Sequence, residues 1–200
     1  MDPKDEFANK ALEYFKSGYH CSESTFLALT EYLGVRSEFF PRIATGFHGG
    51  FGQTNQICGA VSGAVLALGL KFGRDSLEQH GWSTTDKVNL LVSDFSRHKE
   101  GKITCNQITQ QDFSDRERFE EFRANRRIRD CGEGAVHYAV RRAIEVMEMD
   151  WPPPEEGPIA KRLGGGKLGA PDSGHQQGEV IIESHGSARP NAVEPKPDRR

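Results

Sequence analysis

The sequence lacks the compact cysteine motifs that usually mark a metal site. Its four cysteines form no CxxC, CxxCH or ferredoxin-type run, and they lie far apart along the chain: Cys21, Cys58, Cys105 and Cys131. These absences exclude attachment of c-type haem and argue against an ordinary zinc finger. Four separate thiols can still form one site if the fold brings them together. In a reducing compartment, cysteines indicate metal or redox chemistry more often than structural disulfides.

Long apolar runs, a signal peptide and a strong net charge are also missing. The longest apolar candidate, residues 60–70, is interrupted by serine and glycine and is too short for a membrane span. The first residues lack the basic and apolar regions of a signal peptide. The formal net charge of -3 at pH 7 provides no electrostatic footprint for nucleic acid. We therefore expect a cytoplasmic protein with no membrane span and no nucleic-acid partner.

Hydrophobic residues recur at helical spacing, and sustained strand-like alternation is absent. Phe7, Ala11 and Phe15 indicate one apolar helix face. Residues 57–72 are nearly all apolar and rich in small side chains, which is typical of a central helix that others approach closely. The pattern predicts an all-α protein, with a compact bundle of about six to seven helices in residues 1–151.

Residues 152–200 differ in composition from the rest of the chain. They are rich in glycine, proline and charge, and only residues 180–182 form an apolar group. Such a segment buries too little apolar surface to offset the entropy lost on ordering. We predict a disordered tail that follows a helical domain containing all four cysteines.

Three cysteines lie at sequence signals for a helix start. Cys21 follows the end of the first predicted helix, and Cys58 follows a glycine-rich turn. Cys131 follows Asp130, a favoured N-cap residue. The positive end of a helix dipole favours the thiolate, which is the form that binds metals and attacks disulfides. Together with Cys105, which lies between two predicted helices, they suggest a shared metal or redox site.

Glycines and histidines flank the predicted site. Gly59 and Gly63 follow Cys58, where glycine allows backbone to approach closely and amides to bond sulfur; ordinary close packing of helices explains them equally well. His20 and His48 are candidates for auxiliary ligands or proton carriers. The alternative for each histidine is a satisfied polar group beside a helix cap.

The stretch 46–63, followed by the apolar residues 64–70, resembles the signature of the C_GCAxxG_C_C family. That family is named for an isolated cysteine, a Cys-Gly-Ala-x-x-Gly element and two later cysteines. The resemblance covers about residues 5 to 147 and matches, in order, Cys21, Cys58, Cys105 and Cys131. Members are regarded as redox-active proteins and resemble the iron–sulfur domain of split-Soret cytochromes. The resemblance implies an iron–sulfur cluster bound by these four cysteines.

Three hypotheses follow, in order of preference. The first is a redox protein whose cluster passes single electrons to a partner protein. The second is metal-free thiol–disulfide chemistry, with Cys58 and Cys131 as the low-pKa cysteines. The third is a structural Cys₄ zinc site in an interaction module. A cluster shared by two chains in a homodimer is an alternative to a complete site in one chain.

Two further features bear on partners and substrates. The basic residues Arg123, Arg126, Arg127 and Arg129 follow closely on Glu117, Glu120 and Glu121, and this mixture of charges indicates a solvated helix more than a docking site for an acidic partner. No motif marks a substrate pocket, so the sequence assigns no catalysed reaction.

Overall fold

The computed structural model describes residues 2–79, 81–125 and 127–150. These residues form an all-α structure, as predicted, and no strand occurs among them. The predicted tail, residues 152–200, lies outside them, so the boundary of the helical domain stays a prediction.

Five longer helices make up the body of the bundle: α1 (Pro3–Ser17), α2 (Cys21–Tyr32), α5 (Gly59–Phe72), α6 (Trp82–His98) and α9 (His137–Glu148). Helix α5 packs against α2, α6 and α9, which confirms its predicted central position. Helix α9 is equally central, because it packs against α1, α2, α5 and α6. None of the helices in the described residues is long and apolar enough to cross a membrane.

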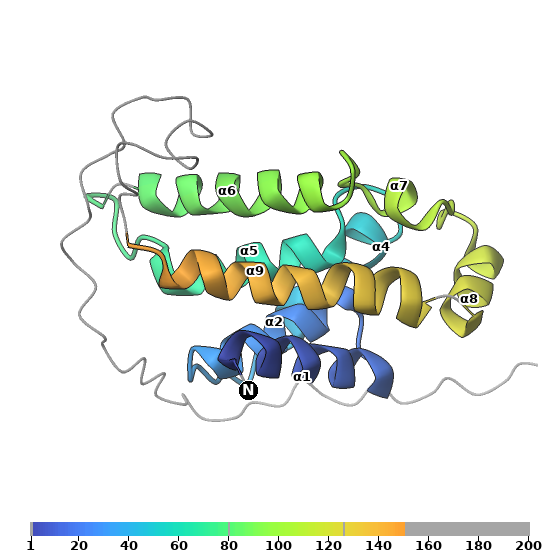
Figure 1. The fold of residues 1–200 in the computed structure, drawn as a ribbon, viewed down its shortest axis with the longest axis horizontal. Helices are drawn as coiled ribbons and strands as arrows, with labels where there is room; N and C mark the ends of the chain where they lie inside the picture. Colours follow the sequence, from blue (N-terminus) through green and yellow to red (C-terminus); the bar gives the residue numbers. More distant parts are fainter. Residues whose placement is uncertain (1, 80, 126, 151–200) are drawn as a thin grey trace, which may run out of the picture.

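The remaining elements are shorter: α3 (Arg42–Thr45), α4 (His48–Phe51), α7 (Cys105–Thr109), α8 (Arg116–Asn125) and a π-helix, η1 (Ile128–Val136). The described residues therefore contain nine α-helices and one π-helix, more than the six to seven expected. Much of the difference comes from single-turn helices in segments that the sequence presents as loops. Figure 1 shows α4, α7 and α8 toward the same end of the bundle.

Local sequence explains how the first helix begins and ends. The Asp2 side chain accepts a hydrogen bond from the backbone N–H of Lys4, and proline occupies the first helical position. Gly18 ends the helix with φ of 121°, a backbone conformation that glycine adopts readily. The buried face of α1 carries Ala8, Ala11 and Phe15.

Close contact between α2 and α5 depends on small residues. A Cβ atom at Gly63 would collide with the carbonyl oxygen of Ser22 and come within 3.1 Å of the Cβ of Thr25. The two helices can therefore approach only because this position is glycine. This contact fixes the start of α2, and with it Cys21, beside the start of α5.

Candidate functional site

The four cysteines come together at the end of the bundle where α4, α7 and α8 lie. Cys21, Cys105 and Cys131 line one cavity of about 40 Å³. Cys58 does not line it and is buried, 5% exposed. Burial raises the pKa of Cys131 well above its ordinary value, and negative charge on Cys21, Cys58 and Cys105 raises it further, which places all four thiols within electrostatic reach of one another. All four are free thiols.

A short antiparallel bridge between Ile57 and Thr104 holds Cys58 and Cys105 together. The N–H of Cys58 donates to the carbonyl of Ile103 at 3.0 Å, and the N–H of Cys105 donates to the carbonyl of Gln56 at 2.7 Å. The start of α5 is thus joined directly to the start of α7. Two cysteines that are distant in sequence are fixed by backbone hydrogen bonds.

Cys105 is the first residue of α7, a helix start that the sequence reading missed. The side-chain oxygen of Gln107 accepts from the backbone N–H of Thr104 at 3.2 Å. Thr104 and Gln107 form a capping box, and the S/T-x-x-E/Q pattern was present in the sequence as a signal for this helix start.

The expected helix start at Cys131 is wrong. Cys131 lies inside η1, which runs directly into α9, and Asp130 is an internal residue of that π-helix. Arg127 before it already has helical φ and ψ of -51° and -45°, so Asp130 does not act as an N-cap. The cysteines at the starts of helices are therefore Cys21, Cys58 and Cys105. Single π-helical turns are rare and often occur at functional sites.

The expectation of low-pKa cysteines is also wrong. Burial raises the pKa of all four thiols and brings that of Cys58 to about 12. The backbone amides of Gly49 and Ser22 act in the opposite direction on the pKa of Cys21, but burial outweighs them. Desolvation and mutual repulsion thus exceed the effect of the helix N-termini. Without a bound cation, these thiols are protonated at neutral pH.

His20 and His48 lie at one edge of the cavity, where their rings stack 4.0 Å apart. The Nδ1 of His48 lies 2.8 Å from the carbonyl oxygen of Thr45. The backbone N–H of His20 and the hydroxyl of Thr45 both donate to the carboxylate of Glu23. A partly buried hydrogen-bond network thus holds this segment at the cavity wall, and the roles of the two histidines as ligands or proton carriers stay predictions.

Helix α8 and the residue just before η1 contribute side chains that the charge pattern had assigned to solvent. Arg123 and Arg127 both line the cavity. Arg127 donates to the backbone carbonyls of Phe15 and Tyr19, and its guanidinium lies 4.0 Å from the centre of the Phe15 ring. Lys99 is also nearby, since charge on Cys58 and Cys131 acts on its pKa. Three cationic side chains therefore lie near the thiols.

Three phenylalanines close the opposite side. Phe113 packs against Phe119 and Phe122 of α8, with ring centres 5.2 and 5.0 Å apart. Phe113 and Phe122 form a buried cluster with Cys105. The N–H of Phe113 donates to the side chain of Asn55 at 2.9 Å, which ties this cluster to the glycine-rich turn. These rings shield the thiols from water.

Comparison with known proteins identifies the family of the chain. The sequence profile of the family described as "Putative redox-active protein (C_GCAxxG_C_C)" matches residues 19–146. The chain belongs to the C_GCAxxG_C_C family. A curated relative from Archaeoglobus fulgidus, described as an uncharacterized protein, is 31% identical over 71 residues, which cover 35% of this chain and 47% of the relative. The match thus spans about half the length of that relative. No solved structure matches the chain.

The structure gives separate roles to the two glycines of the C_GCAxxG_C_C element. A Cβ atom at Gly59 would lie 2.6 Å from the Sγ of Cys21 and 2.9 Å from the carbonyl oxygen of Phe47. Gly59 therefore makes room for a cysteine of the site. Gly63 instead contacts the backbone of α2, so it acts on the site only through the packing of two helices.

Proposed function

We propose that this redox-active protein binds an iron–sulfur cluster through its four cysteines and transfers electrons to a partner protein. The observation that carries the proposal is that four free thiols from four separate segments lie within electrostatic reach of one another, with Cys21, Cys105 and Cys131 lining one cavity. Because all four come from one chain, a second copy is not needed to supply ligands. The expected cofactor ligands are Cys21, Cys58, Cys105 and Cys131.

The surroundings of the thiols fit a negatively charged thiolate centre. Arg127 and Lys99 supply positive charge, and the backbone amide of Gly49 is placed to act on the sulfur of Cys21. The phenylalanines of the cavity exclude water. When bound, an iron–sulfur cluster exchanges single electrons at a potential that depends on charge, hydrogen bonds and burial. Binding would displace the protons that the buried thiols hold at neutral pH.

The two rival hypotheses have less support. A zinc site needs its ligands within about 2.0–2.3 Å of one point. In the part of the chain that the structure describes, no three His, Cys, Asp or Glu side chains are placed to hold one metal ion. Ligands of a cluster bind different iron atoms and can lie further apart. Thiol–disulfide exchange requires a thiolate, and burial raises the pKa of both Cys58 and Cys131, the proposed attacking groups.

Replacement of Cys58 tests the proposal. The full chain, Cys58→Ser and Ser62→Ala should be purified without oxygen and analysed for iron and acid-labile sulfide. Ser62 lies one turn further along α5, and its hydroxyl donates to the carbonyl of Cys58 at 3.3 Å, so Ser62→Ala is a matched control. We expect iron and sulfide to persist in the control and to be lost or strongly reduced in Cys58→Ser. Unchanged iron in a folded Cys58→Ser protein would refute the proposal.

A further inference from the structure

We propose that an exposed apolar surface formed by α3, α4 and the residues beside them docks a small acidic redox protein, which exchanges one electron with the neighbouring cysteine site. This surface, called here the α3–α4 face, carries the side chains of Phe39, Ile43, Phe47 and Phe51. The inference rests on the proposed function, because it names the class of partner and the place where that partner binds.

The α3–α4 face has apolar side chains at every fourth residue. Phe39, Ile43 and Phe51 are 44%, 43% and 46% exposed, and they are three of the seven large hydrophobic side chains that are exposed in the described residues. The ring of Phe47 lies 5.1 Å from that of Phe51. The same segment packs inward through Ala44, which is fully buried. Exposed apolar residues that gather in this way mark an interaction site, whereas single ones need no explanation.

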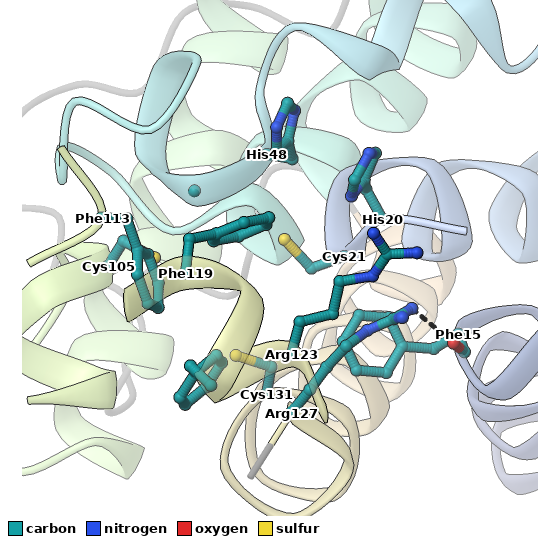
Figure 2. A pocket seen from close by; sticks show the side chains of 12 residues that line it. Phe15, His20, Cys21, His48, Cys105, Phe113, Phe119, Arg123, Arg127 and Cys131 are labelled. Carbon is teal, nitrogen blue, oxygen red and sulfur yellow. Dashed lines mark hydrogen bonds between the residues drawn. The ribbon is translucent and has the colours of Figure 1, made fainter. Parts of the chain in front are cut away.

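The segment that carries this face also forms a wall of the cysteine cavity. His48 and Gly49 lie between Phe47 and Phe51 in the sequence, and both line the cavity; Figure 2 shows His48 at its edge. The backbone amide of Gly49 acts on the sulfur of Cys21. A partner on the α3–α4 face is therefore separated from a cysteine of the site by one short helix.

The aromatic side of the cavity offers no comparable approach. Phe113 and Phe122 are only 2% and 5% exposed, and they form a buried cluster with Cys105. A partner protein on that side would meet α8 before it came near a thiol. The α4 side is thus the better place for electrons to enter or leave.

The charges beside the face favour an acidic partner over a second copy of the chain. Residues 34–57 contain two arginines, Arg36 and Arg42, and one acidic residue, Glu38, whereas the whole chain has a net charge of -3. Both arginines are exposed. Arg42 lies over the Phe39 ring at 5.7 Å and forms no ion pair within the described residues. Two copies meeting through this face would bring like charges together, while an acidic rim on a partner would be attracted.

The test uses the full-length, cluster-containing protein with a flavodoxin as the acidic one-electron probe. When the two are mixed without oxygen, the reduced flavin loses one electron and the oxidised protein gains it, and the colour of the flavin reports the rate. We expect a second-order rate constant that falls as the salt concentration rises, because salt screens the attraction between the two proteins.

Ile43→Glu removes an apolar contact and adds a charge that repels an acidic partner, so the rate constant should fall roughly tenfold or more. Ile43→Lys removes the same contact but keeps the attraction, and it should lower the rate constant less. Phe51→Asn, which suits the φ of 57° at that position, should also lower it.

Leu77→Glu is the matched control. Leu77 is 84% exposed and lies in the loop between α5 and α6, at the opposite end of the bundle from α4 (Figure 1). It adds the same charge far from the face and should change the rate constant less than twofold.

A rate constant that Ile43→Glu leaves unchanged would overturn the inference, as would an equal loss in Leu77→Glu. Absence of any reaction between flavodoxin and the wild type would also overturn it. A wild-type dimer that Ile43→Glu separates in sedimentation would overturn it in favour of an interface between two copies.

Iron, sulfide and the rate of reduction by a small viologen are measured on the same samples. A full cluster that viologen reduces equally in all variants, with no effect of Ile43→Glu on the flavodoxin reaction, would refute the docking face and leave the proposed function intact. A protein without a cluster would contradict the proposed function. Calorimetric titration with flavodoxin then decides the face: binding that Ile43→Glu weakens would support it, and absence of binding would overturn it.

Discussion

Gly59 lies against the sulfur of Cys21, so closely that a Cβ atom at position 59 would be only 2.6 Å from Sγ. The same atom would be 2.9 Å from the backbone oxygen of Phe47, so neither neighbour can move away freely. This contact places the first glycine of the C_GCAxxG_C_C element beside Cys21 and leaves no room for a larger residue without a shift of its neighbours.

We predict that Gly59→Ala displaces Cys21 and lowers the iron content several-fold, with a loss of about 1–3 kcal/mol in the free energy of unfolding from overpacking. Gly69→Ala, on the same helix, is the control, because no atom lies within 4 Å of a Cβ there. That control should keep its iron and gain about 0.5–1 kcal/mol from helix propensity. Iron analysis and urea denaturation measure both effects, and an iron content unchanged by Gly59→Ala would contradict the role of Gly59.

The pKa values of the cysteines predict slow alkylation of the native, metal-free protein. Burial raises the pKa of Cys58 to about 12, and that of Cys131 well above its ordinary value. Iodoacetamide should therefore react slowly at pH 8, and much faster after unfolding in urea, because unfolded thiols titrate near pH 8.5. Rapid reaction of native Cys58 or Cys131, mapped by mass spectrometry, would restore the disulfide hypothesis.

Lys87 predicts a pH dependence of stability that is unrelated to the cysteines. Its side chain is buried, with Nζ 3.4 Å from the carbonyl of Val146 and 4.4 Å from the centre of the Phe72 ring. Burial, aided by the charge of Lys71, lowers the pKa of Lys87 from 10.5 to about 8. Folding therefore opposes its protonation, so this residue destabilises the fold below pH 8, and the penalty disappears as pH rises toward 10.5.

Lys87→Met should raise the free energy of unfolding by about 2 kcal/mol at pH 7. Each unit by which the pKa of Lys87 is lowered corresponds to about 1.4 kcal/mol of destabilisation, which the variant removes. The variant also loses the contacts of Nζ with the Val146 carbonyl and the Phe72 ring, so the gain is smaller than the pKa shift alone implies. The difference between variant and wild type should shrink toward zero by pH 10.5. Urea denaturation across this range measures it, with Lys102→Met as an exposed control. A difference that does not vary with pH would show that packing, not ionisation, is responsible.

Asp94 pairs with Arg142 in the interior of the bundle. The Nε of Arg142 donates to Oδ2 of Asp94 at 2.9 Å, and the side chain of Asp94 is only 6% exposed. Asp94→Ala should cost about 1.5–3 kcal/mol, because the largely buried guanidinium of Arg142 loses a charged hydrogen-bond partner and keeps the carboxylate of Glu145, 2.7 Å away. Arg97→Ala removes an exposed partner of the same carboxylate and should cost less than about 1 kcal/mol. Equal losses, measured by denaturation, would contradict this ranking.

Hydrophobic spacing was sufficient to predict the helical fold and the central position of α5, because those features depend on local periodicity. The grouping of the cysteines was expected, but not its cause. The bridge between Ile57 and Thr104 joins segments more than forty residues apart and has no periodic signal. The local signal at Asp130 was misleading, because the chain was already helical before it.

The electrostatics of the site were harder to predict. The direction of the cysteine pKa shifts depends on burial, which only the tertiary structure defines. Arg123 and Arg127 occur close to glutamates in the sequence and so resemble residues of a solvated helix. In the structure, both side chains line the cavity. A charge pattern describes a helix surface but not what covers that surface.

The central claim is that the four cysteines hold one iron–sulfur cluster. The most direct test is the visible absorption spectrum of the full chain purified without oxygen, together with iron, sulfide and zinc analysis of the same sample. We predict a brown protein with broad visible absorption and matched amounts of iron and sulfide. A colourless protein that contains zinc, or one that remains metal-free after anaerobic reconstitution with iron and sulfide, would contradict the claim.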